Sequence, residues 1–316
     1  MLDWIHMNKR ICITGGLGFI GSHFVQMALD KGYQVINIDS ETYAARKDVN
    51  FETHPNYEFI KEDIVSLKHL PPNIDWVVNF AAESHVDNSI LANQLFFESN
   101  TRGVYNLLEL IRAKDPSDRP KLLHISTDEV YGDIFEGSRS EEDRLKPSNP
   151  YSATKSAAEQ LIFGWGRTYG LPYIICRSSN NYGIGQYPEK LIPKTIEYTL
   201  EGKKMTVHGD GSYSREWTCV SDNCAGLFVA MEKGTIGEIY NISSGELLTN
   251  LEVVTFILKE LGKSEDHFEF VENRVGQDIR YCIDSSKIQN LGWKPEHALK
   301  EYLPEYIEWY KKRYDK

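Results

Sequence analysis

Five side chains in the first half of the sequence could together carry proton-transfer chemistry. Tyr151 and Lys155 are four residues apart in a predicted helix that begins after Pro147 and Pro150, so both lie on one helical face. A lysine cation can lower the pKa of a nearby phenol and make tyrosine a usable base. A tyrosine and a lysine at this spacing also occur by chance as a surface aromatic–cation pair.

The other three residues follow a predicted buried strand at 122–126. Thr127, Asp128 and Glu129 stand at its carboxyl end, where open α/β sheets bind their ligands. Thr127 can donate a hydrogen bond to a reacting hydroxyl. Two adjacent carboxyl groups in different surroundings can have separated pKa values, so that one acts as acid and the other as base. Solvated loop charges, or a helix cap formed by Asp128, are the structural alternatives.

A glycine-rich segment predicts a dinucleotide site. Residues 15–21 read Gly-Gly-Leu-Gly-Phe-Ile-Gly, between a strand at 10–14 and a helix that starts at Phe19. Glycines let the backbone approach a pyrophosphate, which the helix N-terminus then holds. Asp39 ends the next strand, where a carboxylate accepts from the ribose hydroxyls and repels a 2′-phosphate. The pattern favours NAD over NADP; a plain strand-to-helix turn with a loop acid is the alternative.

These residues require an alternation of strands and helices, and the sequence has one from Arg10 to about Asn180. Short apolar runs predict strands buried on both faces of a parallel sheet at 11–14, 34–38, 57–60, 76–80, 122–126 and 173–177. Helical patterns cover 19–31, 94–113 and 152–169. The predicted fold class is α/β, a Rossmann-type doubly wound parallel sheet with a smaller, interleaved C-terminal lobe.

The chain of 316 residues is long enough for two lobes. Residues 1–180 form the predicted NAD-binding domain, and 220–243 return to it through a strand at 237–242. Residues 181–219 and 244–316 form the predicted substrate lobe. Further helices are expected at 191–201, 221–232, 251–261 and 302–310.

The composition excludes several classes of protein. A net charge of -11 argues against nucleic acid as a partner. The five cysteines contain no C-x-x-C pair, which fits a reducing cytosol better than a disulfide framework or a metal site. No run approaches the length of a membrane span or a signal peptide. We therefore expect a cytoplasmic protein without a metal or a membrane partner.

From about Lys9 to Trp309, the sequence resembles the extended short-chain dehydrogenase/reductase family, and within it the dTDP-glucose 4,6-dehydratases. The resemblance is carried by four stretches: FAAESHVD at 80–87, STDEVYG at 126–132, RSSNNYG at 177–183 and PEKLIP at 188–193. The Thr-Asp-Glu triplet discriminates best, because related 4-epimerases usually lack both acids there.

The resemblance implies dehydration of dTDP-glucose to dTDP-4-keto-6-deoxyglucose. In that reaction NAD oxidises C4, water is eliminated across C5 and C6, and hydride returns to C6, so NAD is not consumed. Tyr151 would take the proton of the 4-hydroxyl, Lys155 would hold the cofactor ribose, and Thr127 would steady the hydroxyl. Glu129 would remove the C5 proton, and a protonated Asp128 would donate to the departing 6-hydroxyl.

The same resemblance implies two sets of binding residues. For NAD they are Gly15, Gly18, Phe19, Ile20, Gly21, Asp39, Asp63, Ile64, Phe80, Ala81, Ala82, Ser99, Tyr151, Lys155 and Asn181. For the nucleotide sugar they are Ser84, Thr127, Asn180, Lys190, Leu191, Arg215, Asn250, Arg274 and Gln277. Arg215 and Arg274 suit a diphosphate, because a planar guanidinium binds its oxygens in bidentate fashion.

Three positions depart from the family pattern around the nucleotide. Gln277 replaces a usual histidine and cannot carry positive charge, while Thr206 and His208 replace proline and tyrosine. The reaction type is thus better supported than the base, with UDP-glucose as the alternative to dTDP-glucose. A UDP-sugar 4-epimerase, a UDP-glucuronate decarboxylase and a non-catalytic NAD sensor are the other candidates. A homodimer through helices 94–113 and 152–169 is expected, and rhamnose is one of several deoxysugars that share this intermediate.

Overall fold

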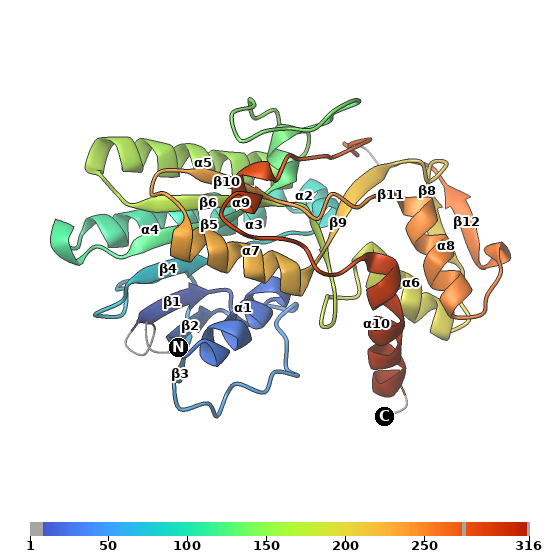
Figure 1. Cartoon of the computed structure of the whole chain (residues 1–316), viewed down its shortest axis with the longest axis horizontal. Coiled ribbons are helices and arrows are strands. Elements are labelled where there is room, and N and C mark those ends of the chain that lie inside the picture. The colour runs from blue at the N-terminus through green and yellow to red at the C-terminus, as the bar shows by residue number, and fades with distance from the viewer. Residues whose placement is uncertain (1–8, 274–275, 315–316) are drawn as a thin grey trace.

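The computed structural model describes residues 9–273 and 276–314. A seven-stranded parallel sheet with helices on both faces makes up most of the chain, and a smaller lobe lies at one end (Figure 1). The strand order is β10-β6-β5-β4-β1-β2-β3, which confirms the doubly wound α/β fold. The strands are β1 (Arg10–Thr14), β2 (Gln34–Asp39), β3 (Tyr57–Lys61), β4 (Trp76–Asn79), β5 (Lys121–Thr127), β6 (Tyr173–Ser178) and β10 (Ile239–Ile242).

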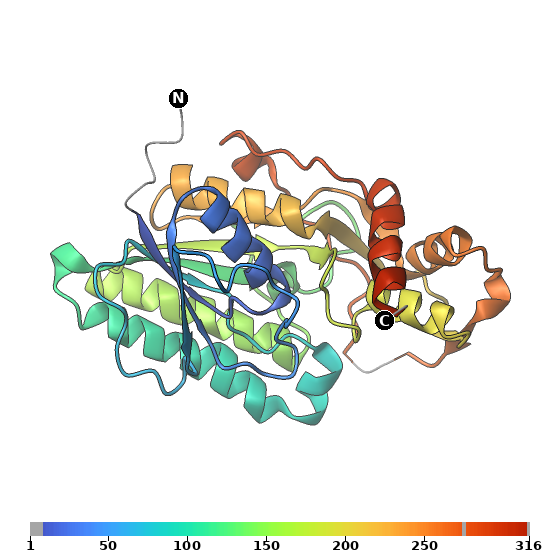
Figure 2. The same cartoon turned by 90° about the horizontal axis from the view of Figure 1, so that it is seen from below.

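Alternate residues of the strands face two separate hydrophobic cores, as the pleat of a strand requires. On one face, Ile11 and Ile13 pack with α1 (Phe19–Asp30) and α7 (Val220–Lys233). On the other, Cys12 packs with α4 (Gly103–Arg112) and α5 (Pro150–Tyr169). Figure 2 shows these helix pairs on opposite sides of the sheet.

The prediction that every strand is buried on both faces is wrong for β3. This strand pairs only with β2 at the edge of the sheet, and its Glu58 and Phe59 are exposed. An edge strand has a neighbouring strand on one side only, so it needs fewer apolar side chains than the inner strands.

The helix predicted at 94–113 is interrupted. It is preceded by α2 (Val86–Leu91) and consists of α3 (Asn93–Phe96), a π-helix (Phe97–Arg102) and α4. The wide turn directs Asn100 inward, where its amide donates to the Glu83 carbonyl at 2.9 Å and to Thr154 Oγ1 at 3.0 Å. Its Oδ1 accepts from the Glu83 amide at 2.8 Å. The irregularity therefore ties this helix to the loop after β4 and to α5.

Helix α5 has strong signals at both ends. The Asn149 side chain accepts from the Ser152 amide at 2.9 Å, and the Ser152 hydroxyl completes a capping box. Pro150 occupies the first turn, and Gly170 ends the helix with a left-handed φ of 67°. These caps place Tyr151 and Lys155 in the first two turns, at the carboxyl ends of the strands.

The smaller lobe is built from two short sheets and three longer helices. Its core joins α6 (Leu191–Leu200), α8 (Asn250–Glu260) and α10 (Leu299–Tyr314) through residues such as Ile192, Val253 and Leu303. The sheets contain β7 (Asn180–Tyr182), β9 (Ser214–Cys219) and β11 (Leu247–Thr249), and β8 (Met205–His208) with β12 (Phe268–Val271). The remaining elements are α9 (Ser286–Gln289) and short 3-10 turns at Pro116–Asp118, Asp128–Tyr131 and Glu265–His267.

The chain returns from the smaller lobe to the large sheet. The strand expected at 237–242 is β10, which pairs in parallel with β6. The exact boundaries of the two lobes stay a prediction. Among residues 9–273 and 276–314, no helix is long and apolar enough to cross a membrane.

Candidate active site

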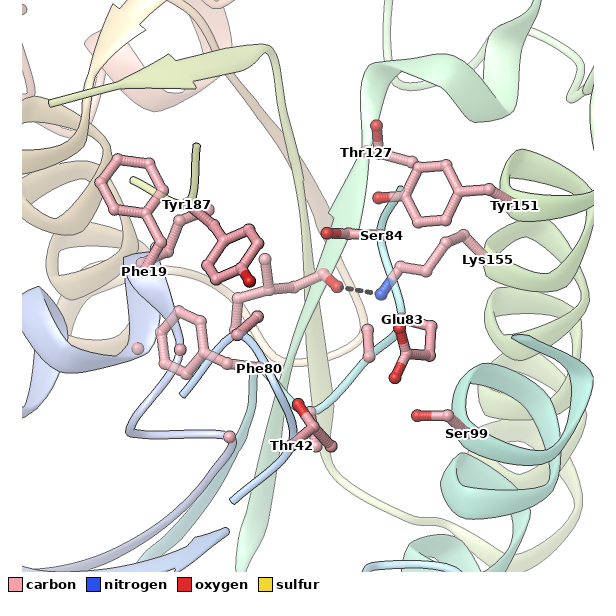
Figure 3. A pocket seen from close by; sticks show the side chains of 18 of the residues that line it. Phe19, Thr42, Phe80, Glu83, Ser84, Ser99, Thr127, Tyr151, Lys155 and Tyr187 are labelled. Atoms are coloured by element: carbon pink, nitrogen blue, oxygen red, sulfur yellow. Dashed lines mark hydrogen bonds between the residues drawn. The ribbon is translucent and has the colours of Figure 1, made fainter. Parts of the chain in front are cut away.

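A cavity of about 500 Å³ lies at the carboxyl ends of the central strands. Its walls come from the glycine loop after β1, the ends of β2, β4 and β5, and the start of α5. Figure 3 shows Thr127, Tyr151 and Lys155 on one side of this space and Phe19 and Phe80 on the other. This is the edge at which the strand order reverses, where doubly wound sheets bind dinucleotides.

The glycine loop is packed too tightly to admit side chains. Gly15 has a φ of 73°, and a Cβ there would lie 2.5 Å from the Ala81 amide nitrogen. A Cβ on Gly21 would lie 2.2 Å from the Gly15 carbonyl oxygen. Gly18 precedes α1, and no side chain in the described part of the chain caps that helix. Its first-turn N–H groups and dipole thus suit a pyrophosphate.

Asp39 lies beside this loop at the end of β2. Its carboxylate accepts from the Leu17 amide at 2.9 Å and from the Glu41 amide at 2.8 Å. Burial raises the pKa of Asp39, while the two amide donors act in the opposite direction. An acid fixed here suits ribose hydroxyls and disfavours a 2′-phosphate. The cradle that the glycines form and this carboxylate therefore fit NAD.

The other residues expected to contact the cofactor also line the cavity. They come from the loops after β3 and β4, from the π-helix and from β7: Asp63, Ile64, Phe80, Ala81, Ala82, Ser99 and Asn181. Gly103 allows α4 to approach Ile64 closely, because a Cβ at Gly103 would lie 2.5 Å from Ile64 Cδ1. Ile64 is thereby held against the cavity wall.

Thr127 stands at the centre of the polar cluster. Its hydroxyl donates to Asp128 Oδ1 at 3.2 Å and accepts from the Glu129 amide at 3.3 Å. It also forms a hydrogen bond with Tyr151 that lowers the pKa of the phenol. One hydroxyl thus connects the tyrosine on α5 with the acids that follow β5.

The expected lowering of the Tyr151 pKa by Lys155 stays a prediction. The Lys155 ammonium donates to the Ile125 carbonyl at 2.6 Å (Figure 3), and burial lowers its pKa to about 8. Burial, followed by the charge of Glu129, raises the pKa of Tyr151 well above its ordinary value. In this structure, the main-chain carbonyl engages the ammonium, and Thr127 is the group that favours the phenolate.

The two acids lie in different surroundings. Asp128 is 2% exposed, and its Oδ2 has no hydrogen-bond partner among the residues that the structure describes. Burial, then the charges of Glu129 and Glu216, raise its pKa well above the usual range. Glu129 accepts from the Asn149 amide group at 3.2 Å, which opposes the rise that burial causes in the Glu129 pKa. Asp128 is therefore the acid that holds a proton more firmly.

A second cavity of about 200 Å³ adjoins the first, and Glu129 lines both. Its walls include most of the residues expected to bind the nucleotide sugar: Ser84, Asn180, Lys190, Leu191, Arg215, Asn250 and Gln277. Arg274 lies outside the described residues. Thr206 and His208, which depart from the family pattern, also line this space.

Two cations in the second cavity are anchored by main-chain oxygens. Lys190 donates to the Ser84 carbonyl at 2.9 Å. Arg215 donates from Nη1 to the Ser214 carbonyl at 2.8 Å and from Nη2 to the Asp278 carbonyl at 2.7 Å. Bidentate binding of a diphosphate by Arg215 stays a prediction, because these bonds already engage both terminal nitrogens.

Sequence reasoning missed a strap that joins two loops at the cofactor cavity, residues 42–46 and 183–189. Tyr43 donates to Glu189 at 3.2 Å, and the rings of Tyr43 and Tyr187 meet edge to face. Gly185 has a φ of 85°, and a Cβ there would lie 2.4 Å from the guanidinium carbon of Arg46. Because glycine has no side chain, Gly185 leaves room for Arg46. The two residues are more than a hundred positions apart, so no local sequence pattern reveals this contact.

Sequence reasoning also missed a buried ion pair behind the site. Arg177 on β6 is 1% exposed and binds both oxygens of Glu159, with the shortest contact at 2.6 Å. Glu159 accepts from Ser126 as well, the residue before Thr127. A signal was present, because Glu159 follows Lys155 by four residues on the same face of α5.

Comparison with known proteins agrees with this geometry. Residues 12–306 match the family model of GDP-mannose 4,6 dehydratase. The chain is 46% identical to the low-salt glycan biosynthesis protein Agl12 of Haloferax volcanii, over 95% of this chain and 98% of that protein. It is 42% identical to a dTDP-glucose 4,6-dehydratase of Haemophilus influenzae, over 95% and 97% of the two chains.

A solved structure shares the fold across nearly the whole chain. The DesIV double mutant, a dTDP-glucose 4,6-dehydratase from Streptomyces venezuelae crystallised with NAD bound, matches with a TM-score of 0.91 and 36% identity. The match covers 97% of this chain and 98% of that one. The resemblance that the motifs predicted is thereby confirmed, and the chain belongs to the GDP-mannose 4,6 dehydratase family.

Proposed function

We propose that the protein dehydrates dTDP-glucose to dTDP-4-keto-6-deoxyglucose with NAD as a recycled cofactor. The observation that carries the proposal is the pair Asp128 and Glu129, two adjacent acids in unlike surroundings beside Tyr151. An elimination needs both an acid and a base. The named relatives that are dTDP-glucose 4,6-dehydratases support the same reaction.

The first step removes the proton of the 4-hydroxyl. Tyr151 acts in its phenolate form, which the hydrogen bond with Thr127 favours and which the positive charges of Lys155 and of bound NAD would favour further. The phenolate takes this proton as the C4–H bond breaks, and Thr127 steadies both oxygens through its hydroxyl. Lys155 holds the ribose hydroxyls of the cofactor. When bound, NAD supplies the acceptor that oxidises C4 and later returns the same reducing equivalent to C6.

The second step eliminates water. The 4-ketone acidifies the C5 hydrogen, and Glu129 removes that proton. The electron pair of the C5–H bond expels the 6-hydroxyl, which leaves as water with the proton of Asp128. In the last step C6 is reduced, and Glu129 returns a proton to C5.

The proton count of this scheme requires a connection between Tyr151 and Asp128. Tyr151 ends the cycle with the proton of the 4-hydroxyl, whereas Asp128 ends it without the proton that left in water. The Thr127 hydroxyl forms hydrogen bonds with both groups. We assign to it the transfer that restores both residues for the next cycle.

The experiment is incubation of the purified protein with dTDP-glucose, without added cofactor, followed by mass spectrometry and NMR of the product. Loss of one water with a ketone at C4 is expected, because NAD is regenerated in each cycle and is expected to remain bound. A product of unchanged mass with an inverted C4 centre would make the protein a 4-epimerase. Turnover of UDP-glucose in preference to dTDP-glucose would reassign the base.

A homodimer belongs to the same proposal. Large apolar side chains are exposed on the helices after β4: Leu91, Leu95, Phe97 and Tyr105. Tyr169 at the end of the neighbouring α5 is exposed as well. Figure 2 shows α4 and α5 side by side on the outer face of the sheet. A second copy that pairs these helices would cover this surface, and sedimentation velocity tests it.

The cellular setting is inferred from the cysteines. All five are free, and four are buried, which suits a reducing compartment. We therefore place the reaction in the cytoplasm, in the synthesis of a deoxysugar such as rhamnose.

A further inference from the structure

Glu129 forms a hydrogen bond with a residue that the proposed reaction does not use. Tyr281 donates to Glu129 Oε2 at 3.5 Å, from the wall of the second cavity. The same phenol can instead donate to Asp278 Oδ2, and the Ser148 hydroxyl donates to that Asp278 oxygen. These contacts join Glu129, Tyr281, Asp278 and Ser148 into one chain of polar groups.

This chain runs from the reacting centre to the surface. Tyr281 is 4% exposed and Asp278 is 2% exposed, whereas Ser148 is exposed to solvent. Asp278 Oδ1 is buried without a hydrogen-bond partner in the described part of the chain. A buried carboxyl oxygen in that position can carry a proton at little cost to its existing contacts.

The phenol is arranged to pass a proton and not merely to hold one. It has a single hydrogen and two carboxyl groups that can accept it, so donation to one excludes donation to the other. The Arg215 guanidinium lies 4.4 Å from the centre of the Tyr281 ring. Its charge opposes the rise in the Tyr281 pKa that burial and the two acids cause.

We propose that Tyr281 and Asp278 relay protons between Glu129 and solvent at Ser148. When Glu129 removes the C5 proton, its new O–H donates to the Tyr281 oxygen, and Tyr281 passes its own hydrogen to Asp278. Asp278 exchanges this proton with water next to Ser148. The reverse sequence delivers a solvent proton to Glu129 before C5 is protonated, so no net charge remains on the phenol.

The relay matters once substrate fills the second cavity. Glu129 is partly exposed to the two cavities, and a sugar nucleotide bound there displaces the water that would otherwise reach it. The route through the wall then connects the base with solvent. Tyr281 and Asp278 act through Glu129 and do not touch the reacting atoms, so they are positioning residues in this scheme.

The test, which rests on the proposed dehydration, is the deuterium content at C5 of the product made in D₂O. Wild-type protein is expected to place solvent deuterium at C5. Tyr281→Phe, which keeps the ring beneath Arg215, is expected to return mostly the original proton. Tyr213→Phe is the matched control, since it removes a phenol that accepts from Asn273 at 2.8 Å and that does not line either cavity; it should match wild type.

Two results would overturn the relay. One is wild-type product without deuterium at C5, and the other is equal deuterium in wild type and Tyr281→Phe. If the variant makes no product, both proteins can be given dTDP-4-keto-6-deoxyglucose in D₂O. The rate at which each exchanges the C5 hydrogen for deuterium then tests the relay without the elimination step. A wild-type protein that leaves dTDP-glucose unchanged would instead refute the proposed function.

Discussion

Replacement of Asp128 by asparagine should stabilise the ligand-free protein near neutral pH and block the elimination. Asp128 is almost fully buried, and in the described residues its Oδ2 lacks a partner. Burial, then the charges of Glu129 and Glu216, raise its pKa well above the usual range. The folded protein therefore holds a proton that the unfolded chain releases. Asparagine has the shape of the protonated acid and does not titrate.

The sign and size of the effect follow from proton linkage. Because the folded state binds more protons than the unfolded state, the stability of the wild type falls as pH rises above the unfolded-state pKa of aspartate. Each pH unit over which the folded carboxyl stays protonated costs about 1.4 kcal/mol. The asparagine variant lacks this cost. The difference in the free energy of unfolding between the variant and the wild type should therefore grow by about 1.4 kcal/mol per pH unit until Asp128 ionises.

The assay is urea unfolding of both proteins at several pH values between about 5 and 8. Asp118→Asn, at an exposed acid, is the control and should follow the wild type. With dTDP-glucose, Asp128→Asn should accumulate NADH, because C4 is oxidised while water cannot leave. A stability gap that does not change with pH, or a variant less stable throughout, would show that Asp128 is ionised and would refute its role as the acid.

Three further outcomes are expected. Arg177→Met should lower the free energy of unfolding by about 3–5 kcal/mol, because it leaves Glu159 charged and buried. The double variant Arg177→Met with Glu159→Leu should lose much less. A double-mutant cycle measured by denaturant unfolding checks this, and additive losses of the two single variants would contradict the pairing. Arg46→Ala should speed the loss of NAD during gel filtration by opening the strap at Gly185, whereas unchanged retention would exclude that function. Asp39→Ser should shift the ratio of Kd values toward NADP by more than about tenfold, since like charges at an interface cost several kcal/mol; an unaltered ratio in a binding titration would argue against the acid as the discriminator.

The sheet was predictable because its strands carry a physical signal. A strand covered by helices on both sides is mostly apolar, and β1, β2, β4, β5 and β6 each contain two or more consecutive or alternating buried apolar residues. The π-helix at 97–102 could not be anticipated, because the bonds of Asn100 with Glu83 and Thr154 join segments that are far apart in the sequence. The three-residue strands β7 and β11 are too short to show a period.

The site divides in a similar way. Residues that were predicted from contiguous motifs line the two cavities, because a motif encodes its own local geometry. Tyr281 and Asp278 were missed, since the second lobe brings them to Glu129 from more than a hundred residues away. The expected lowering of the Tyr151 pKa by Lys155 stays a prediction, and sequence spacing gave no sign of the Ile125 carbonyl that engages the ammonium.

The late return of the chain to β10 has a consequence for how the protein is made. Sixty residues, 179–238, separate the end of β6 from the start of β10, so a ribosome at ~5–20 residues per second leaves the edge of β6 unpaired for ~3–12 s. Ile174, Ile175 and Cys176 in that strand are fully buried once β10 is in place. Until then an apolar strand edge is open to other chains. A fragment that stops after β6 should therefore aggregate on expression, and any cut intended to isolate the nucleotide-binding half has to follow Ile242.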